Sequence, residues 1–342
     1  MLRITYYILL LIAVTACEKE KNNGITNFKF KTKSDTYNFN RELNSDLSVT
    51  DTIHNFPLVS FFQDNIVNKF IYASSHDKGV IYKFDKTLNV IDTISKQGPG
   101  PKEFQNPLCI KSLKDKLIFI DNGQYALKNY SKKNKLISTI KSKATFFQFS
   151  VLSENICYLS SQKNDNHKNS LEFKKASLVD NNIQDIVVNK DSYFKNQFIN
   201  HAYQGEFCSN KNYAIYYPLY GGKLIIFSNN FNDVDFLKTV DNTKKAKAKR
   251  VNVGNYSVMQ TNKDKYIYIN ARLNNQDNLY LLNSVSDSKH FYIDIYDINN
   301  KNYINSYKIP ILNNQKPKDF IVIDKQLFLL YSDYTLLKCK LL

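Results

Sequence analysis

The chain has 342 residues, of which 43% are hydrophobic, which excludes an intrinsically disordered protein and leaves ample material for a core. Its formal net charge of +16 comes almost entirely from lysine. A Lys-, Asn- and Ile-rich, Gly-poor composition also results from an AT-rich genome, so the charge does not indicate a nucleic-acid partner, and we expect none. The 24 Tyr and 23 Phe favour β-strands, and Asn is expected at the left-handed turn positions that Gly usually takes.

The N-terminus has the layout of a bacterial lipoprotein signal. It reads MLRITYYILLLIAVTAC, in which one arginine precedes an apolar run too short to span a bilayer. The run ends in small residues and Cys17, which resembles a lipobox, where the cysteine thiol is diacylated and the chain is cut before it. The alternative is an ordinary signal peptide with an incidental cysteine. Lipidation predicts a stable anchor at the cell envelope, in the outer membrane.

The predicted organisation is a signal peptide over residues 1–16, a lipidated cysteine and tether over 17–24 and a folded domain over 25–342. The other four cysteines, Cys109, Cys157, Cys208 and Cys339, lie far apart in strand-like apolar stretches. Disulfides are possible in an exported protein, but we expect buried free thiols. No Cys-x-x-Cys or His/Cys cluster indicates zinc, and no metal or other cofactor is predicted.

A strand pattern recurs along the folded domain. Six segments share a turn residue, a Lys or Asn and alternating apolar positions; they begin at Asn68, Asp115, Glu154, Lys211, Asp264 and Asp324. Their spacing of about 50 residues is in the range of propeller blades. A short apolar stretch such as YSVMQTN, from Tyr256, precedes each segment, and a hairpin-like pair follows the first five. Four strands per unit and six units predict an all-β fold, a six-bladed β-propeller.

The last unit has only three strands before the chain stops. An open edge in a ring would expose unpaired backbone groups, so a strand from the N-terminus should complete this blade. The candidates are ITNFKFKTK, Ile25 to Lys33, and TYNFN, from Thr36.

The stretch QGPGPKEF, Gln97 to Phe104, is expected to be the crossing from the rim of one blade to the centre of the next. A phosphate-binding loop would need Lys-Ser/Thr after its glycine and a following helix, and neither is present. Gly-Pro-Gly followed by Glu-Phe and Pro107 resembles the signature of the TolB-like six-bladed propeller lipoproteins of Bacteroidota. YQGEF, Tyr203 to Phe207, is a degenerate echo of it. The resemblance implies the fold and an envelope location, and it supplies no catalytic residues.

Binding is expected on the face that carries the long connections, such as those from Ser160 and Asn270. The histidines, which also map there, are His54, His76, His167, His201 and His290; they form either a metal or acid–base site or ordinary solvated turns. The candidate ligand-binding residues are Arg272, His201, Tyr217 and Tyr220. Arg272 could instead form a structural ion pair, and the tyrosines could be core residues. The run KKAKAKR, Lys244 to Arg250, is expected to be a short helix or solvated loop between units four and five.

The leading functional hypothesis is a non-catalytic binding or scaffold lipoprotein that holds a glycan, peptide or protein partner. The alternative is a metal-dependent propeller hydrolase or lyase that acts at the channel mouth. No nucleophile–base set, Gly-x-Ser-x-Gly elbow or His-Glu-x-x-His helix is visible, and no catalytic residue is predicted. A third reading is a docking subunit of a larger outer-membrane assembly, which an exposed apolar patch would support.

Overall fold

The structure is a computed structural model of the whole chain. It describes residues 21–22, 25–31, 36–44, 47–54, 62–63, 70–75, 80–94, 98, 100, 103, 107–113, 116–121, 124–131, 133, 135–141, 146–153, 155–163, 169–177, 183–186, 204–241, 243, 246, 248–253, 256–261, 267–284, 291–323 and 325–341. The predicted signal peptide, Cys17 and His201 lie outside these residues. Within them, no helix has the length and apolar character needed to cross a bilayer.

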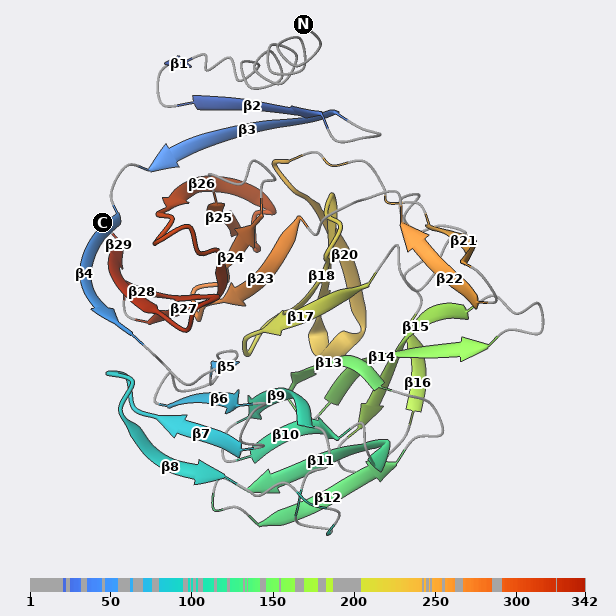
Figure 1. Ribbon diagram of the computed structural model, residues 1–342. Helices are drawn as coiled ribbons and strands as arrows, with labels where there is room; N and C mark the ends of the chain where they lie inside the picture. Colours follow the sequence, from blue (N-terminus) through green and yellow to red (C-terminus); the bar gives the residue numbers. More distant parts are fainter. Residues whose placement is uncertain are drawn as a thin grey trace, which may run out of the picture.

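Most of the described chain is β-strand, arranged as successive antiparallel meanders that follow one another around the molecule (Figure 1). Sheet one holds β5 (Phe62–Gln63), β6 (Ile71–Ser75), β7 (Val80–Phe84) and β8 (Val90–Ile94). Sheet two holds β9 (Pro107–Leu113), β10 (Lys116–Asp121), β11 (Ala126–Ser131) and β12 (Leu136–Lys141). Sheet three holds β13 (Phe146–Leu152), β14 (Asn155–Lys163), β15 (Asn169–Ser177) and β16 (Ile183–Ile186).

Three more meanders follow. Sheet four holds β17 (Gly205–Ser209), β18 (Ala214–Pro218), β19 (Lys223–Ser228) and β20 (Asp233–Lys238). Sheet five holds β23 (Tyr268–Leu273), β24 (Asn278–Asn283), β25 (Phe291–Asp297) and β26 (Asn302–Ile309). Sheet six holds β27 (Pro317–Ile323), β28 (Gln326–Tyr331), β29 (Leu336–Leu341) and the N-terminal strand β4 (Leu47–Ile53).

The first strand of each sheet lies on the inside of the molecule. β9 contacts β5 and β13, β17 contacts β13 and β23, and β23 contacts β27. These strands therefore surround the centre, and the fourth strands lie at the rim (Figure 1). We refer to β5, β9, β13, β17, β23 and β27 as the inner strands.

The core consists of apolar layers between neighbouring sheets, because each strand presents alternate side chains to the sheets on either side. One layer packs Leu224 and Ile226 of sheet four against Leu279 and Leu281 of sheet five. Another packs sheet one against sheet six, with Ile71 and Phe84 beside Ile321. The first and last meanders therefore share a core, although they are far apart in the sequence. Cys157, Cys208 and Cys339 are buried free thiols, as predicted; the side chain of Cys109 is not among those described.

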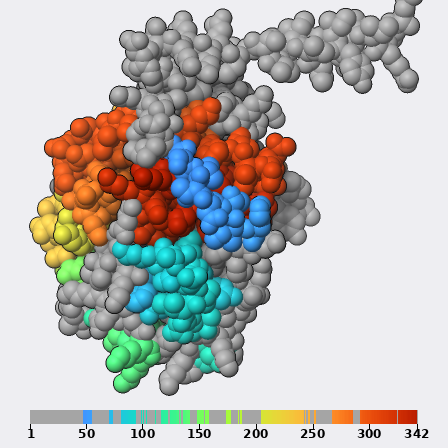
Figure 2. Space-filling view, turned by 90° about the vertical axis from the view of Figure 1, so that its left-hand side faces the viewer, coloured from blue at the N-terminus to red at the C-terminus, as the bar shows by residue number. Residues whose placement is uncertain are grey.

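An N-terminal strand does pair with the last sheet, but it is not one of the two candidates. β4 pairs antiparallel with β29, from Leu336↔Ile53 to Leu341↔Leu47. The candidates β2 (Ile25–Lys31) and β3 (Thr36–Asn44) instead pair with each other, and β3 extends sheet five by a short parallel pairing with β26. In Figure 2 β4, in blue, lies between the red C-terminal strands and the cyan strands of sheet one.

The sequence of β4 explains why it takes the rim position of sheet six. It ends VTDTI, which differs at one position from VIDTI of the rim strand β8. In both strands the threonine N–H donates to the preceding aspartate Oδ1 at 2.8 Å. Almost all of β4 is exposed, which suits the rim and not the interior. The prediction that β2 or β3 completes the last sheet is therefore wrong.

The predicted first strand of the fifth unit, YSVMQTN, is not part of sheet five. YSVMQTN forms β22 (Tyr256–Thr261), which pairs with β21 (Ala248–Val253) as a separate hairpin, and the inner strand of sheet five is β23. The end of the KKAKAKR run is therefore a strand and not a helix or loop. The segment from Asn270, expected to be a long loop, contains most of β23 and all of β24. Alternation of Asn270 and Arg272 with the buried Ala271 and Leu273 accounts for this strand.

The Gly-Pro joint before β9 is held by a buried ion pair. The Gly100 N–H donates to Glu103 Oε2, and the Glu103 N–H donates to the Gly100 carbonyl, both at 2.9 Å. A Cβ at residue 98 would lie 2.1 Å from Glu103 Oε2, so any larger residue there would displace the folded-back carboxylate. Lys128 Nζ donates to the Glu103 carbonyl at 2.8 Å and lies 2.9 Å from Asp121 Oδ2. The motif is therefore a structural joint tied to β10 and β11.

Candidate functional site

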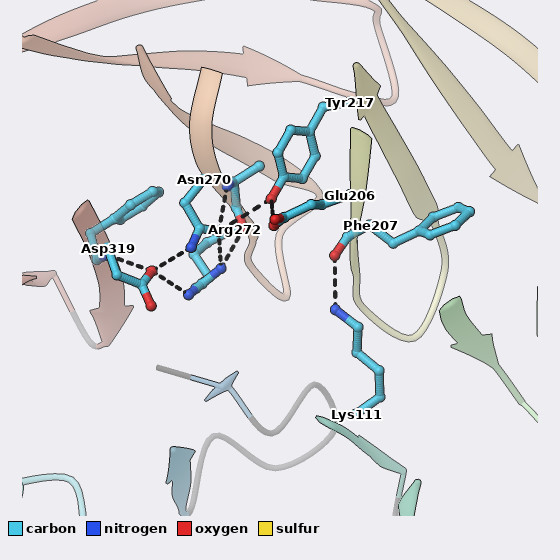
Figure 3. Close-up of polar contacts among 9 residues, drawn as sticks. Lys111, Glu206, Phe207, Tyr217, Asn270, Arg272 and Asp319 are labelled. Carbon is cyan, nitrogen blue, oxygen red and sulfur yellow. Dashed lines mark hydrogen bonds and ion pairs between the residues drawn. The ribbon is translucent and has the colours of Figure 1, made fainter. Parts of the chain in front are cut away.

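Four inner strands bring charged or amide side chains into one region at the centre (Figure 3). Lys111 comes from β9, Glu206 from β17, Asn270 and Arg272 from β23, and Asp319 from β27. We call these five residues the central cluster. Asn270 and Arg272 are two positions apart on β23, so they share one side of the strand while Ala271 and Leu273 pack into the core.

Asp319 is the fixed acceptor of the cluster. Its Oδ1 accepts from Arg272 Nη2 and from Asn270 Nδ2, each at 2.6 Å, and from the Phe320 N–H at 2.7 Å. The Asp319 side chain is 2% exposed and that of Arg272 13%. Arg272 Nη1 also donates to Asn270 Oδ1 and, at 2.9 Å, to the Ala271 carbonyl. The guanidinium is therefore held in one orientation, because its planar donors meet several acceptors at once.

Tyr217 links this ion pair to the second carboxylate. Its hydroxyl donates to Glu206 Oε2 at 2.8 Å and lies 3.3 Å from Asn270 Oδ1. Burial, and then the charge of Glu206, hold the pKa of Tyr217 well above its usual value, so the hydroxyl stays a neutral donor. Asn270 thus connects Arg272 with the Tyr217–Glu206 pair.

Gly205 sets the position of Glu206. A Cβ at residue 205 would lie 2.4 Å from the Tyr217 carbonyl oxygen and 2.9 Å from Pro218 Cα. Only glycine allows β17 to approach β18 this closely, and Glu206 follows immediately. The YQGEF echo is therefore not equivalent to QGPGPKEF, because Glu206 lies in an inner strand and Glu103 in a joint.

Lys111 reaches across the centre from sheet two to sheet four. Its Nζ donates to the Phe207 carbonyl at 2.8 Å (Figure 3). Sheet three lies between these two sheets, since β13 contacts both β9 and β17. Burial raises the pKa of the adjacent Cys208 to about 12; the charges of Lys111 and Arg272 oppose this shift, and Glu206 adds to it. The three charges thus act on one thiol, which stays protonated.

The central cluster presents both charges and an amide to solvent. It combines cationic, anionic and amide groups, of which Lys111, Glu206, Asn270 and Arg272 are partly exposed. Among the described residues, no group of three or more His, Cys, Asp or Glu is arranged to hold a metal ion.

The predicted site residues meet different outcomes. Arg272 and Tyr217 come together through Asn270. Arg272 lies in an inner strand and not in the expected loop. It forms an ion pair with Asp319, which is the structural role that the sequence offered as the alternative to ligand binding. The Tyr217 ring is buried, so only its hydroxyl takes part. Tyr220 packs against a core layer instead. His54 is exposed at the end of β4, and the other four histidines, His201 included, lie outside the described residues.

Sequence reasoning missed Lys111, Glu206, Asn270 and Asp319. Each is a polar residue that interrupts an apolar first strand, in PLCIKSL, GEFCS, YINARL and PKDFIVI. That recurrence in four units was the available signal.

Comparison with known proteins identifies the fold. No protein-family model matches the chain, and no curated protein matches it. A DUF4221 family member from Bacteroides vulgatus has 11% identity and a TM-score of 0.54, over 86% of this chain and 97% of that one. A predicted exported protein from Bacteroides fragilis has 13% identity and a TM-score of 0.51, over 83% of each chain. An inactive variant of virginiamycin B lyase from Staphylococcus aureus, solved with quinupristin, has 9% identity and a TM-score of 0.51, over 87% of this chain and 100% of that one. The chain therefore has a β-propeller fold, and identities this low show the fold alone.

Proposed function

We propose that the chain is a lipid-anchored envelope protein, a TolB-like six-bladed propeller that binds a polar ligand at its centre without catalysis. Six meanders in the described residues and the core shared by sheets one and six support a closed ring of six blades. The lipobox supports an anchor at Cys17, and the likeness to a predicted exported Bacteroides protein is consistent with the envelope. The outer membrane is part of this proposal.

The central cluster is the observation that carries the binding function. Its positively and negatively charged groups complement the ionised groups and amides of a short peptide better than the uncharged hydroxyls of a neutral glycan. Arg272, Asn270 and Tyr217 are already fixed by one another, so little ordering would accompany binding. A peptide segment, free or at the end of a partner protein, is therefore the proposed ligand.

Catalysis at the same centre, by metal-dependent hydrolysis or by a lyase reaction, is the alternative. One similar structure is a lyase, but that likeness extends only to the fold, and a fold does not imply an activity. No feature of the central cluster favours this alternative.

The proposal is tested by applying the full chain, in detergent, to peptide and glycan arrays and then incubating each bound ligand with the protein. We expect charged peptides to be retained and recovered intact. Retention of neutral glycans alone would overturn the peptide assignment, and cleavage of a bound ligand would overturn the non-catalytic one. Cys17→Ser tests the anchor separately and should move the protein from the membrane to the soluble fraction.

A further inference from the structure

A cavity of about 380 Å³ lies away from the central cluster, between sheets three and four. Leu152, at the end of β13, the β17–β18 turn and the β19–β20 turn line it. Lys211 follows the far end of β17 from Glu206, so the cavity and the central cluster lie toward opposite ends of that strand. It opens on the side of the tight turns, where the sequence predicted no binding.

The β19–β20 turn has an unusual backbone. Asn229, Asn230 and Phe231 all adopt left-handed conformations, with φ of 47°, 54° and 68°. Such a conformation is unfavourable for residues other than glycine and seldom extends over three of them. The buried Phe231 ring, 6.0 Å from that of Phe227, holds the turn in place. Asn229 and Asn230 are thereby kept exposed at the cavity, and no hydrogen bond of their side chains is seen within the described part of the chain.

The opposite wall is also fixed before any ligand arrives. Asn210 Oδ1 accepts the N–H groups of Asn212 and Tyr213 at 2.8 Å, which shapes the β17–β18 turn. Asn210 Nδ2 in turn donates to Asp277 Oδ1 at 2.6 Å. The Tyr213 hydroxyl donates to Asn299 Oδ1 at 2.9 Å, which limits rotation of its half-buried ring.

We propose that this cavity binds one acidic sugar residue, a hexuronate, independently of the central site. The Asn229 and Asn230 amides both donate and accept, as sugar hydroxyls require. The half-buried ring of Tyr213 offers an apolar edge to the C–H groups of a pyranose, and the buried Leu152 lies behind it in the wall of the cavity. Exposed Lys211 supplies one cation at the rim for one carboxylate. A phosphate group would be better served by several cationic donors, and Lys211 is the single cation among the described residues of the lining.

Galacturonate and galactose form the test pair, because they differ only in the carboxylate. With the full chain in detergent, calorimetric titration should show galacturonate binding roughly fivefold more tightly, the effect of one partly exposed charge-assisted contact. Lys211→Gln should abolish this preference, whereas Lys86→Gln, an exposed lysine in the β7–β8 turn of sheet one, should leave it intact.

Asn230→Gly separates binding from folding. Glycine accepts a φ of 54° without strain, so the variant should melt at or above the wild-type temperature. Loss of the amide should nevertheless weaken both sugars by roughly fivefold. The proposal is overturned if neither sugar binds, if both bind equally to the wild type, or if binding is unchanged in Lys211→Gln and Asn230→Gly.

Discussion

Replacing Lys128 with methionine should destabilise the protein strongly, because it removes the cation that holds the Gly-Pro joint. Lys128 and Asp121 are 2% and 0% exposed, and their charged atoms are 2.9 Å apart. Breaking a buried pair by removing one partner costs about 3–5 kcal/mol, since the other charge is left in the interior. The lost hydrogen bond to the Glu103 carbonyl adds about 1 kcal/mol. We therefore expect the free energy of unfolding to fall by roughly 4–6 kcal/mol.

Urea unfolding followed by far-UV circular dichroism measures this free energy. Tryptophan fluorescence cannot be used as the probe, because the chain has no tryptophan. The matched control is the double variant Lys128→Met/Asp121→Asn, which removes both charges and keeps the shape of the aspartate. It should recover at least half of the loss, because no uncompensated charge remains. The reasoning is refuted if Lys128→Met lies within about 1 kcal/mol of the wild type, or if the double variant is no more stable than the single one.

Gly205→Ala should lower the free energy of unfolding by roughly 2–3 kcal/mol, because the added Cβ meets backbone atoms of β18. Gly100→Ala should lower it by less than about 1 kcal/mol, because the added Cβ meets only the flexible Glu103 side chain. Melting temperatures that are lowered equally in the two variants would contradict this. A chain that starts at residue 46 should fold, but one that starts at residue 55 should aggregate, because β29 loses its pairing with β4; size-exclusion chromatography checks this, and two well-folded monomers would be the contrary result. Stability should be nearly constant between about pH 6 and 8 and fall as the pH rises from about 9 towards 12. Burial raises the folded-state pKa of the Cys208 thiol to about 12 and that of Cys339 to about 11, from an ordinary value of 9. Burial raises the folded-state pKa of Tyr130 to about 12 and those of Tyr216 and Tyr268 well above the usual value of 10, so the folded state holds protons that the unfolded state releases. The unfolding free energy measured at pH 7, 9 and 11 tests this, and equal values at all three would contradict it.

The repeat predicted most of the strands because the apolar alternation of a meander is local. It failed in sheet five, where YSVMQTN alternates like an inner strand and YINARL carries Asn270 and Arg272. Polar residues break a strand pattern where they serve a site, so the inner strand with the most site residues was the hardest to recognise. The likeness of VTDTI to VIDTI was the signal for β4, but the segments from Ile25 and Thr36 alternate polar and aromatic residues more regularly.

Long-range contacts of the site could not be predicted. Lys111 and Phe207 are 96 residues apart and meet only because the inner strands surround a common centre. Left-handed turn positions were foreseen in part: Asn229, Asn230, Asn313 and Asn314 occupy them, but so do residues such as Lys301 and Lys325, because the tight turns impose the conformation on whatever residue is there.

The most direct test of the central claim is isothermal titration of the full chain with a charged peptide retained on the array, for the wild type, Glu206→Gln and Lys86→Gln. The carboxylate of Glu206 is a partly exposed charge of the central cluster, whereas Lys86 lies in an exposed turn of sheet one. We predict that Glu206→Gln weakens binding by about tenfold, as loss of one charge-assisted hydrogen bond would, and that Lys86→Gln binds like the wild type. Equal affinity of all three proteins would contradict binding at the centre of the propeller.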